Sequence, residues 1–219
     1  MSTSVYDARG GIITASMTVL AICYTMIIPF LPIYLLELGV PKADVALWSG
    51  LVFGITFLIA GIMAPIWGKI ADNKGKKRMA LRAGFAIAVS YVLIGMVTDQ
   101  NQLLMGRALV GFANGFYPAA MTMVSLSVDE KQVGRALGIF QTGLILGNVI
   151  GPFLGGAVES VVGMRPVFYI SGIAVFIATL AVLFLVKEPK LEVENTTSKE
   201  QSKQPAKATS LREDFKSVQ

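Results

Sequence analysis

Long apolar stretches alternate with short polar stretches over most of this chain. Six of the apolar stretches are long enough to cross about 30 Å of hydrocarbon as a helix, which takes about 20 residues. They cover 12–36, 47–68, 80–98, 103–125, 136–158 and 166–186. They lack the two-residue alternation of barrel strands, and lipid offers an open backbone no hydrogen-bond partners. The pattern therefore predicts an all-α membrane protein with six transmembrane helices.

Polar segments flank the six predicted spans. Residues 1–11 form a short leading segment, and from Lys187 onward the composition becomes polar and mixes Lys with Glu. Such a segment buries too little apolar surface to fold by itself. We expect three parts: an N-terminal segment over 1–11, a six-helix bundle over 12–186, and a disordered linker or tail over 187–219. The alternative for the tail is a weak amphipathic turn on the membrane, formed by Leu211, Phe215 and Val218.

The composition agrees with a membrane protein and excludes several classes of function. Hydrophobic residues make up 54% of the 219 residues and charged residues 15%, which is too apolar for a soluble domain. The net charge of +5 does not indicate nucleic acid, because the basic residues lie beside apolar spans and form no basic face. There is no histidine, and the single cysteine, Cys23, is expected to pack inside the first span. We therefore expect no metal site, no cofactor and no enzyme activity.

The basic residues near the span ends are distributed unequally between the two sides of the membrane. Lys42 and Arg165 fall on one side. The other side collects Arg9, Lys69, Lys74, Lys76, Lys77, Arg78, Arg82, Lys131, Arg135, Lys187 and Lys190. Short loops rich in Lys and Arg remain in the cytoplasm. We therefore expect a multi-pass protein of the cell membrane with both termini cytoplasmic.

The segment between the second and third spans has the highest charge density in this part of the chain. Residues 68–78 hold five basic residues and one acid. Gly68 and Gly75 are expected to shape its turn, because glycine adopts positive φ without steric cost. The candidate residues of this loop motif are Gly68, Asp72, Gly75, Lys76, Lys77 and Arg78.

An internal repeat relates two parts of the chain. Pro65, Gly68, Asp72 and Arg78 recur 87 residues later as Pro152, Gly155, Glu159 and Arg165. The first copy leaves its span on the cytoplasmic side and the second on the outer side, because three spans lie between them. This arrangement predicts an inverted repeat of three plus three helices, which offers two equivalent arrangements around a central site.

The fifth predicted span carries glycines at steps of four. Gly147, Gly151 and Gly155 share one helix face, on which a neighbouring backbone can approach closely. Pro152 removes a helix hydrogen bond and permits a bend, and Gly156 completes the candidate motif. The alternative is ordinary small-residue packing with no transport role.

Arg107 is the only charge well inside a predicted span. Placing a charge at the centre of the bilayer costs about 2.5 to 3.5 kcal/mol on insertion scales. We therefore expect its guanidinium to face a water-filled cavity with polar partners; the alternative is that it snorkels to the outer headgroups. No carboxylate lies deep in the six spans, so the candidates for a proton carrier reduce to Asp72, Glu37 or water near Arg107, unless the carrier lies in another half.

These motifs together resemble the N-terminal half of a major facilitator superfamily transporter. The more specific likeness is to bacterial drug:proton antiporters with twelve spans, of the MdtG-like multidrug-efflux group. It covers about residues 12–190 and rests on motifs in the expected order. They are Pro29-Phe30-Leu31-Pro32, Trp48-Ser49-Gly50, the loop motif at 68–78, Arg107 with Gly111 and Gly115, and Gly147 to Gly156.

The resemblance implies a role for each motif. Asp72 and the basic residues after it would latch the two halves of a transporter, the glycine face would seal the path against leakage, and Arg107 would serve proton coupling. Val110 and Ala113 stand where the family usually has Gln and Gly, and Asn114 would compensate in part. Candidate residues for a cavity that binds amphiphilic drugs, each with a purely structural alternative, are Tyr24, Met26, Asn114, Tyr117, Gln141 and Asn148.

The function that follows is proton-coupled efflux of drugs or other amphiphilic small molecules by alternating access, with this chain as one half of the transporter. The expected partners are the lipid bilayer, a small-molecule substrate, protons and a second six-helix half, in cis or in trans. Two alternatives remain open. The cargo is another small solute such as a sugar, peptide or metabolite, or the chain is a six-span interaction module that is inactive alone.

Overall fold

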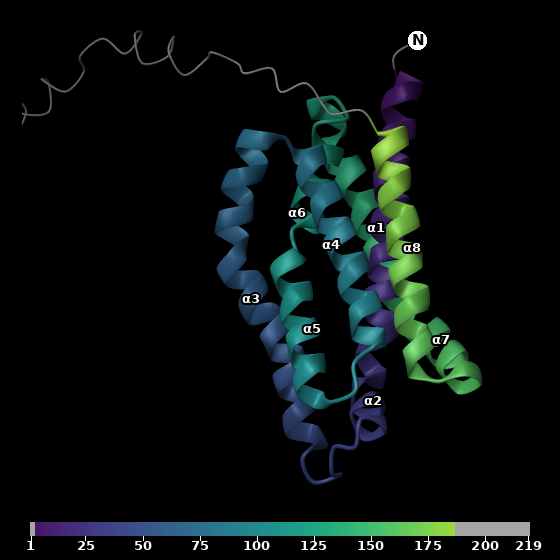
Figure 1. The fold of residues 1–219 in the computed structure, drawn as a ribbon. Helices are drawn as coiled ribbons and strands as arrows, with labels where there is room; N and C mark the ends of the chain where they lie inside the picture. The colour runs from purple at the N-terminus through teal and green to yellow at the C-terminus, as the bar shows by residue number, and fades with distance from the viewer. Residues whose placement is uncertain (1–2, 187–219) are drawn as a thin grey trace, which may run out of the picture. The chain divides into compact units, whose positions relative to one another are not determined.

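The computed structural model describes residues 3–186, which are almost entirely helical (Figure 1). The predicted tail at 187–219 lies outside the described residues. The N-terminal segment expected over 1–11 is helical from Thr3 onward. The helices are α1 (Thr3–Ile27), η1 (Ile28–Phe30), α2 (Leu31–Glu37), α3 (Val45–Lys74), α4 (Lys76–Gly95), α5 (Gln100–Ala113), α6 (Phe116–Ser125), η2 (Glu130–Gln132), α7 (Val133–Val162) and α8 (Met164–Leu185).

Five helical stretches in the described part of the chain are long and apolar enough to cross a membrane. They are Gly10–Glu37, Val45–Lys74, Lys76–Gly95, Glu130–Val162 and Met164–Leu185. They correspond to five of the six predicted spans. The prediction of one continuous helix over 103–125 was wrong, because this part of the chain forms α5 and α6 with a break between them. The count of six crossings stays a prediction.

The break between α5 and α6 follows from three residues. Pro118 has no backbone N–H, and in a continuous helix its ring would clash with the carbonyl group of Asn114, four residues earlier. Gly115 adopts φ +151°, a conformation that side-chain-bearing residues rarely reach. The side-chain oxygen of Asn114 accepts a hydrogen bond of 2.9 Å from the N–H of Gly115. The chain therefore leaves the helix at Asn114 and starts a new one at Phe116.

The packing of the helices follows the predicted inverted repeat. The repeat makes α1 with α2 equivalent to α5 with α6, α3 to α7, and α4 to α8. α1 packs along α7 as α5 packs along α3, and α4 packs along α8. Each helix pair therefore has a counterpart in the other half of the repeat, as an inverted repeat requires.

The α4–α8 pair shows the same symmetry in its polar contacts. The Lys77 Nζ at the start of α4 donates to the Leu183 carbonyl near the end of α8 at 2.8 Å. The Arg165 Nη2 at the start of α8 donates to the Val97 carbonyl just after α4 at 3.1 Å. Each helix supplies a cation to the carbonyl end of its antiparallel partner, where a positive charge is favourable.

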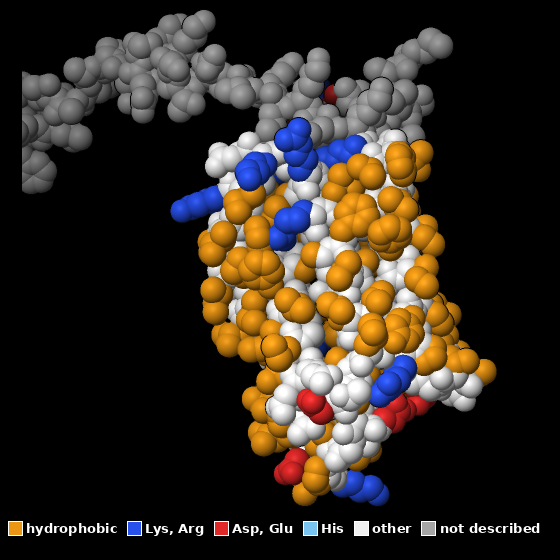
Figure 2. Space-filling model, in the orientation of Figure 1, with side chains coloured by type: hydrophobic (Ala, Val, Ile, Leu, Met, Phe, Trp, Pro, Cys, Tyr) orange, Lys and Arg blue, Asp and Glu red, His pale blue; other side chains and the backbone are white. Residues whose placement is uncertain are grey.

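The surface is divided into an apolar belt and polar ends. Figure 2 shows hydrophobic side chains covering the middle of one face, with Lys and Arg gathered at one end. We call this the basic end; it is where α3 ends and α4 begins. Large apolar side chains are exposed on the surface; Phe153 is 76% exposed and Phe184 is 78% exposed. Such a surface suits lipid or protein contact and not water.

Candidate functional site

The charged motif over 68–78 is not a loop. α3 continues to Lys74 and α4 begins at Lys76, so Gly75 alone forms the turn, at φ +94°. The expectation that Gly68 shapes the turn was wrong, since Gly68 lies within α3 and a Cβ atom there would meet nothing within 4 Å. The charged residues form the polar ends of α3 and α4, beyond their apolar parts. Lys and Asp are favourable there because their side chains can reach water.

Two charges of this motif pair with each other. Asp72 and Lys76 form an ion pair across the turn, the only one in the described part of the chain, with side chains 69% and 16% exposed. Lys77 is engaged at the end of α8, and Arg78 is exposed. The motif thus joins α3 to α4 and α4 to α8, while the predicted latch to a second half stays a prediction.

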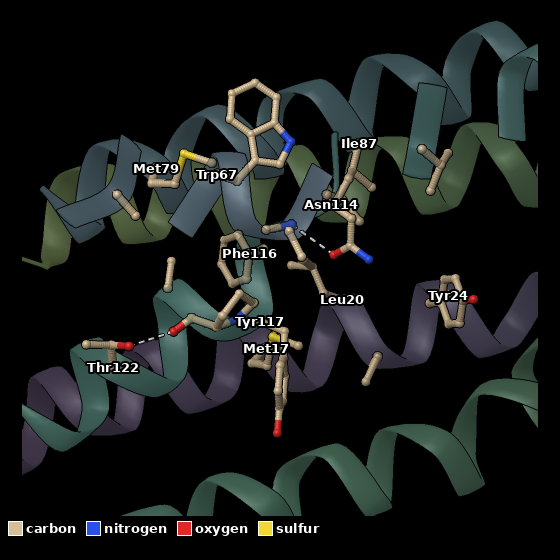
Figure 3. Close-up of a pocket in the computed structure, with 18 of the residues that line it drawn as sticks. Met17, Leu20, Tyr24, Trp67, Met79, Ile87, Asn114, Phe116, Tyr117 and Thr122 are labelled. Carbon is tan, nitrogen blue, oxygen red and sulfur yellow. Dashed lines mark hydrogen bonds between the residues drawn. The ribbon is translucent and has the colours of Figure 1, made fainter. Parts of the chain in front are cut away.

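A cavity of about 580 Å³ extends from the middle of the bundle to the basic end. All the long helices contribute to its wall, which is mainly apolar and aromatic. Figure 3 shows Met17, Leu20 and Tyr24 along α1, with Asn114, Phe116 and Tyr117 from the α5–α6 break across from them. The charged side chains that line the cavity are Asp72 and Lys76, at the basic end.

Four of the six residues predicted for a cavity line this one: Tyr24, Asn114, Tyr117 and Asn148. Gln141 does not line the cavity; it is exposed, and its Nε2 donates to the hydroxyl of Tyr117, which does, at 3.0 Å. Met26 does not line the cavity; it is buried in the core at 5% exposure, with its sulfur 4.0 Å from the Ser171 Oγ. It follows Tyr24 by two residues, a rotation of about 200° that turns it to the opposite side of α1.

Other residues of the wall were not predicted, although some had a signal. Met17 and Leu20 precede Tyr24 by seven and four residues, so the three share one face of α1. The helical spacing from Tyr24 could have identified them. Trp67 and Phe116 also line the cavity. Their positions depend on how α3 and α6 pack, which the local sequence does not indicate.

Arg107 does not line the cavity. Its side chain is 1% exposed, and its Nε and Nη1 have no hydrogen-bond partner among the described residues. The expectation that it faces a water-filled cavity was therefore wrong for this conformation, and it does not snorkel outward either. Tyr24 and Tyr91 are the ionisable groups within electrostatic range of the guanidinium. Both tyrosines line the cavity.

The glycine face of α7 is a seam against α1. A Cβ atom at Gly147 would lie 2.7 Å from the Cβ of Ala21, and those at Gly151 and Gly155 would overlap Thr25 and the Met26 carbonyl group. The Thr25 Oγ1 donates to the Gly147 carbonyl at 3.2 Å. The predicted close approach of a neighbouring backbone is confirmed, whereas the role in sealing stays a prediction. Pro152 lies inside α7, which continues past it to Val162. A Cβ atom at Gly156 would lie 3.3 Å from the ring of Phe30.

Curated relatives share this sequence at a substantial level. The multidrug resistance protein MdtG of Proteus mirabilis is 43% identical over 166 residues, which are 75% of this chain and 41% of that protein. MdtG of Yersinia enterocolitica is 42% identical over 166 residues, 75% of this chain and 40% of that protein. The chain therefore spans about two fifths of the length of the curated relatives it matches.

Solved structures share the fold. The human organic anion transporter MFSD10 superposes with a TM-score of 0.72 at 17% identity, over 84% of this chain and 48% of that one. The POT family transporter PepTSo gives a TM-score of 0.72 at 18% identity, over 80% of this chain and 36% of that one. The family model described as Major Facilitator Superfamily matches residues 13–218. The predicted resemblance is thus confirmed, and the chain belongs to the Major Facilitator Superfamily, a family of membrane transporters and not of enzymes.

Proposed function

We propose that this chain forms one half of a multidrug transporter, which exports amphiphilic small molecules by alternating access in exchange for protons. The observation that carries the proposal is the apolar cavity, open at the basic end, in a chain 43% identical to a multidrug resistance protein. We place the protein in the cell membrane with the basic end and both termini in the cytoplasm, since Lys and Arg are retained there.

The chemistry of the cavity wall supports an amphiphilic cargo. Apolar and aromatic side chains cover most of the wall, and a few groups offer hydrogen bonds: Tyr24, Asn114, Tyr117 and Asn148. Such a wall binds apolar bulk by area and orients it by a small number of polar contacts. Among the described residues of the wall, the charged side chains are Asp72 and Lys76, which pair with each other, so the wall favours neither sign of substrate charge. The alternative is that the cargo is another small solute. Direct binding assays that compare such solutes with amphiphilic drugs decide between the two.

The inverted repeat supports alternating access. The α1–α7 seam and the α3–α5 seam are equivalent under the repeat. Gly111 of α5 lies so close to α3 that a Cβ atom there would overlap the Thr56 carbonyl group, as the glycines of α7 lie close to α1. Two such seams permit two equivalent arrangements of the same helices, one open to each side.

A second six-helix half is the partner that this proposal requires. Large apolar side chains on α3 and α7 stand uncovered, with Phe57 51% and Leu146 51% exposed. The relatives are more than twice as long as the matched segment. We propose that the second half covers these faces, supplied by the same polypeptide or by another chain, and that Asp72 and the basic residues after it contact its helix end.

The role of Arg107 in this proposal is proton coupling. Two nitrogens of the buried guanidinium have no hydrogen-bond partner among the described residues, which is costly, so an acceptor that enters its surroundings would be bound favourably. Tyr24 and Tyr91, which lie within electrostatic range of the guanidinium, both line the cavity. The guanidinium keeps its own proton at physiological pH, so the transferred proton would be carried by Asp72, by Glu37 or by a water near Arg107. Cargo and that carrier would compete for interaction with the same positive charge, which is the requirement for exchange.

Efflux of ethidium in reconstituted vesicles tests the proposal. Vesicles that contain this chain together with the C-terminal half of MdtG should move the dye when a proton gradient is imposed and stop when an ionophore collapses it. A variant tests whether the cavity is the path of the dye. In the same mixture, Asn148→Leu removes a polar group from the cavity wall and should reduce the rate of ethidium efflux. Movement equal to that of empty vesicles would contradict transport and favour an interaction module that is inactive alone.

A further inference from the structure

Two side chains from neighbouring helices meet at the carbonyl end of α5. The Trp67 Nε1 of α3 donates to the Phe112 carbonyl at 2.8 Å, and the Arg82 Nη2 of α4 donates to the Ala113 carbonyl at 3.2 Å. The Arg82 guanidinium carbon lies 3.4 Å from the centre of the Trp67 ring. Three helices are thus joined at one point, immediately before the α5–α6 break.

The break itself creates the need for these contacts. In a continuous helix the Phe112 and Ala113 carbonyls would accept from the N–H groups of Phe116 and Tyr117, four residues later. Because the helix ends at Ala113, these carbonyls lose their helical donors within the predicted membrane-spanning part of the chain, where lipid supplies no donor. An indole N–H and a guanidinium replace the missing donors. A cation at a helix C-terminus and against an aromatic face is favourable on both accounts.

The cluster adjoins the cavity, because Trp67 is part of the wall and Arg82 packs against it. A Cβ atom at Gly115 would be 3.9 Å from the Arg82 Nη2. Gly115, Phe116 and Tyr117 line the cavity, and Trp67 lines it as well. Thr122, farther along α6, lines the cavity toward the basic end. The direction in which the chain leaves the break therefore decides where α6 stands at the mouth of the cavity.

We propose that Arg82 and Trp67 are positioning residues that hold the α5–α6 break in shape and so fix α6 at the cytoplasmic mouth of the cavity. The proposal rests on the proposed transport function for its purpose, since a fixed mouth matters only if cargo passes it. Its geometry rests on the two capped carbonyls alone. The Trp67 Nε1 and the Arg82 Nη2 are engaged by backbone carbonyls, so the role proposed for these two donors requires no contact with the cargo.

The test measures how accessible α6 is from the cytoplasmic side. Cys23 is the only cysteine of the chain and is buried. Thr122→Cys in a Cys23→Ser background therefore places one thiol on the cavity wall. Inverted membrane vesicles are treated with a membrane-impermeant maleimide, and the labelling rate is recorded. Arg82→Gln should raise this rate about tenfold, the equilibrium shift expected when a hydrogen bond from a charged group is lost. Trp67→Phe keeps the ring and should raise it less, and Arg82→Lys should restore most of the parent rate.

The matched control is Arg165→Gln. Arg165 also donates to a helix-end carbonyl, that of Val97 at 3.1 Å, but at the other end of the molecule. It should leave the labelling rate of the thiol at 122 unchanged. An equal effect of Arg165→Gln and Arg82→Gln, an unchanged rate in Arg82→Gln, or a lower one overturns the proposal.

A second background links the effect to the break. With Gly115→Ala and Pro118→Ala together, α5 and α6 can join, and their N–H groups reach the two carbonyls. Arg82→Gln should then have little further effect on labelling; a full effect in this background overturns the proposal. Ethidium efflux is measured separately. A labelling response as expected, together with no dye movement when the chain is combined with the C-terminal half of MdtG, supports the positioning role and contradicts transport.

Discussion

Arg107 is the one charged residue that the described part of the structure buries, at 1% exposure and with two unpartnered nitrogens. Removing a charge held away from water relieves its desolvation cost. We expect Arg107→Met, which keeps the length of the side chain, to unfold at the same or a higher temperature. The same variant should lose the dependence of dye movement on the proton gradient. Thermal unfolding in detergent and efflux with and without an ionophore measure the two effects.

Arg107→Lys serves as the control for this variant, because it keeps the charge and loses the fork of donors. It should retain part of the gradient dependence. A lower unfolding temperature for Arg107→Met would show instead that the guanidinium stabilises the fold, and gradient-dependent efflux by Arg107→Met would exclude a role in coupling.

At the residue scale, the sequence indicated which types of side chain suit a cavity better than it indicated the side of the helix on which each one lies. Tyr24 and Met26 were equally plausible by composition, yet a rotation of about 200° between them puts one in the cavity and the other in the core. Trp67 and Arg82 had no signal as a pair, because their partners are backbone carbonyls that only the break sets free. Every residue has a backbone carbonyl, so a hydrogen bond to one cannot be predicted from the type of the partner residue.

At the element scale the α1–α7 seam allows a direct test of close packing. Gly151→Ala would drive a Cβ atom into Thr25, with the Ile22 carbonyl oxygen at 2.8 Å as well. Overpacking of this kind costs about 1 to 3 kcal/mol. Gly138→Ala on the same helix meets nothing within 4 Å and should stabilise α7 by up to about 1 kcal/mol, since alanine favours the helix. The unfolding temperature should therefore fall for Gly151→Ala and rise for Gly138→Ala. Equal shifts in the two purified variants would exclude close packing of α7 against α1 at Gly151.

Hydropathy predicted the long helices well because lipid imposes one requirement on every span. It missed the α5–α6 break, since a helix interrupted inside the bundle is as apolar as a continuous one. The signal was present in Asn114, Gly115 and Pro118, which combine a positive φ with a missing N–H. The turn at Gly75 shows the same limit: charge indicated a loop, and one glycine was enough to reverse the chain between two helices.

At the scale of the whole molecule, four matched positions in the two repeat copies predicted the topology. The repeat constrains which helices can be equivalent. The caps made by Lys77 and Arg165 show the same reciprocity between α4 and α8, although the repeat matches Arg165 to Arg78 and not to Lys77. The volume and wall of the cavity could not be predicted. They depend on helix packing and on the direction of the break, which are properties of the assembled bundle.

The orientation of the bundle and the number of crossings can be decided together in bacterial cells. Alkaline phosphatase is active only outside the cytoplasm, so fusions after Lys42 and Thr98 should be active and fusions after Gly75 and Asp129 inactive. The reason is the excess of Lys and Arg at the basic end. Fusions of a fluorescent protein that matures only in the cytoplasm provide the reciprocal control at each site. The fusion after Asp129 is decisive for the α5–α6 pair: phosphatase activity there equal to that after Thr98 would mean that the broken helix does not cross, and the three-plus-three arrangement would fail with it.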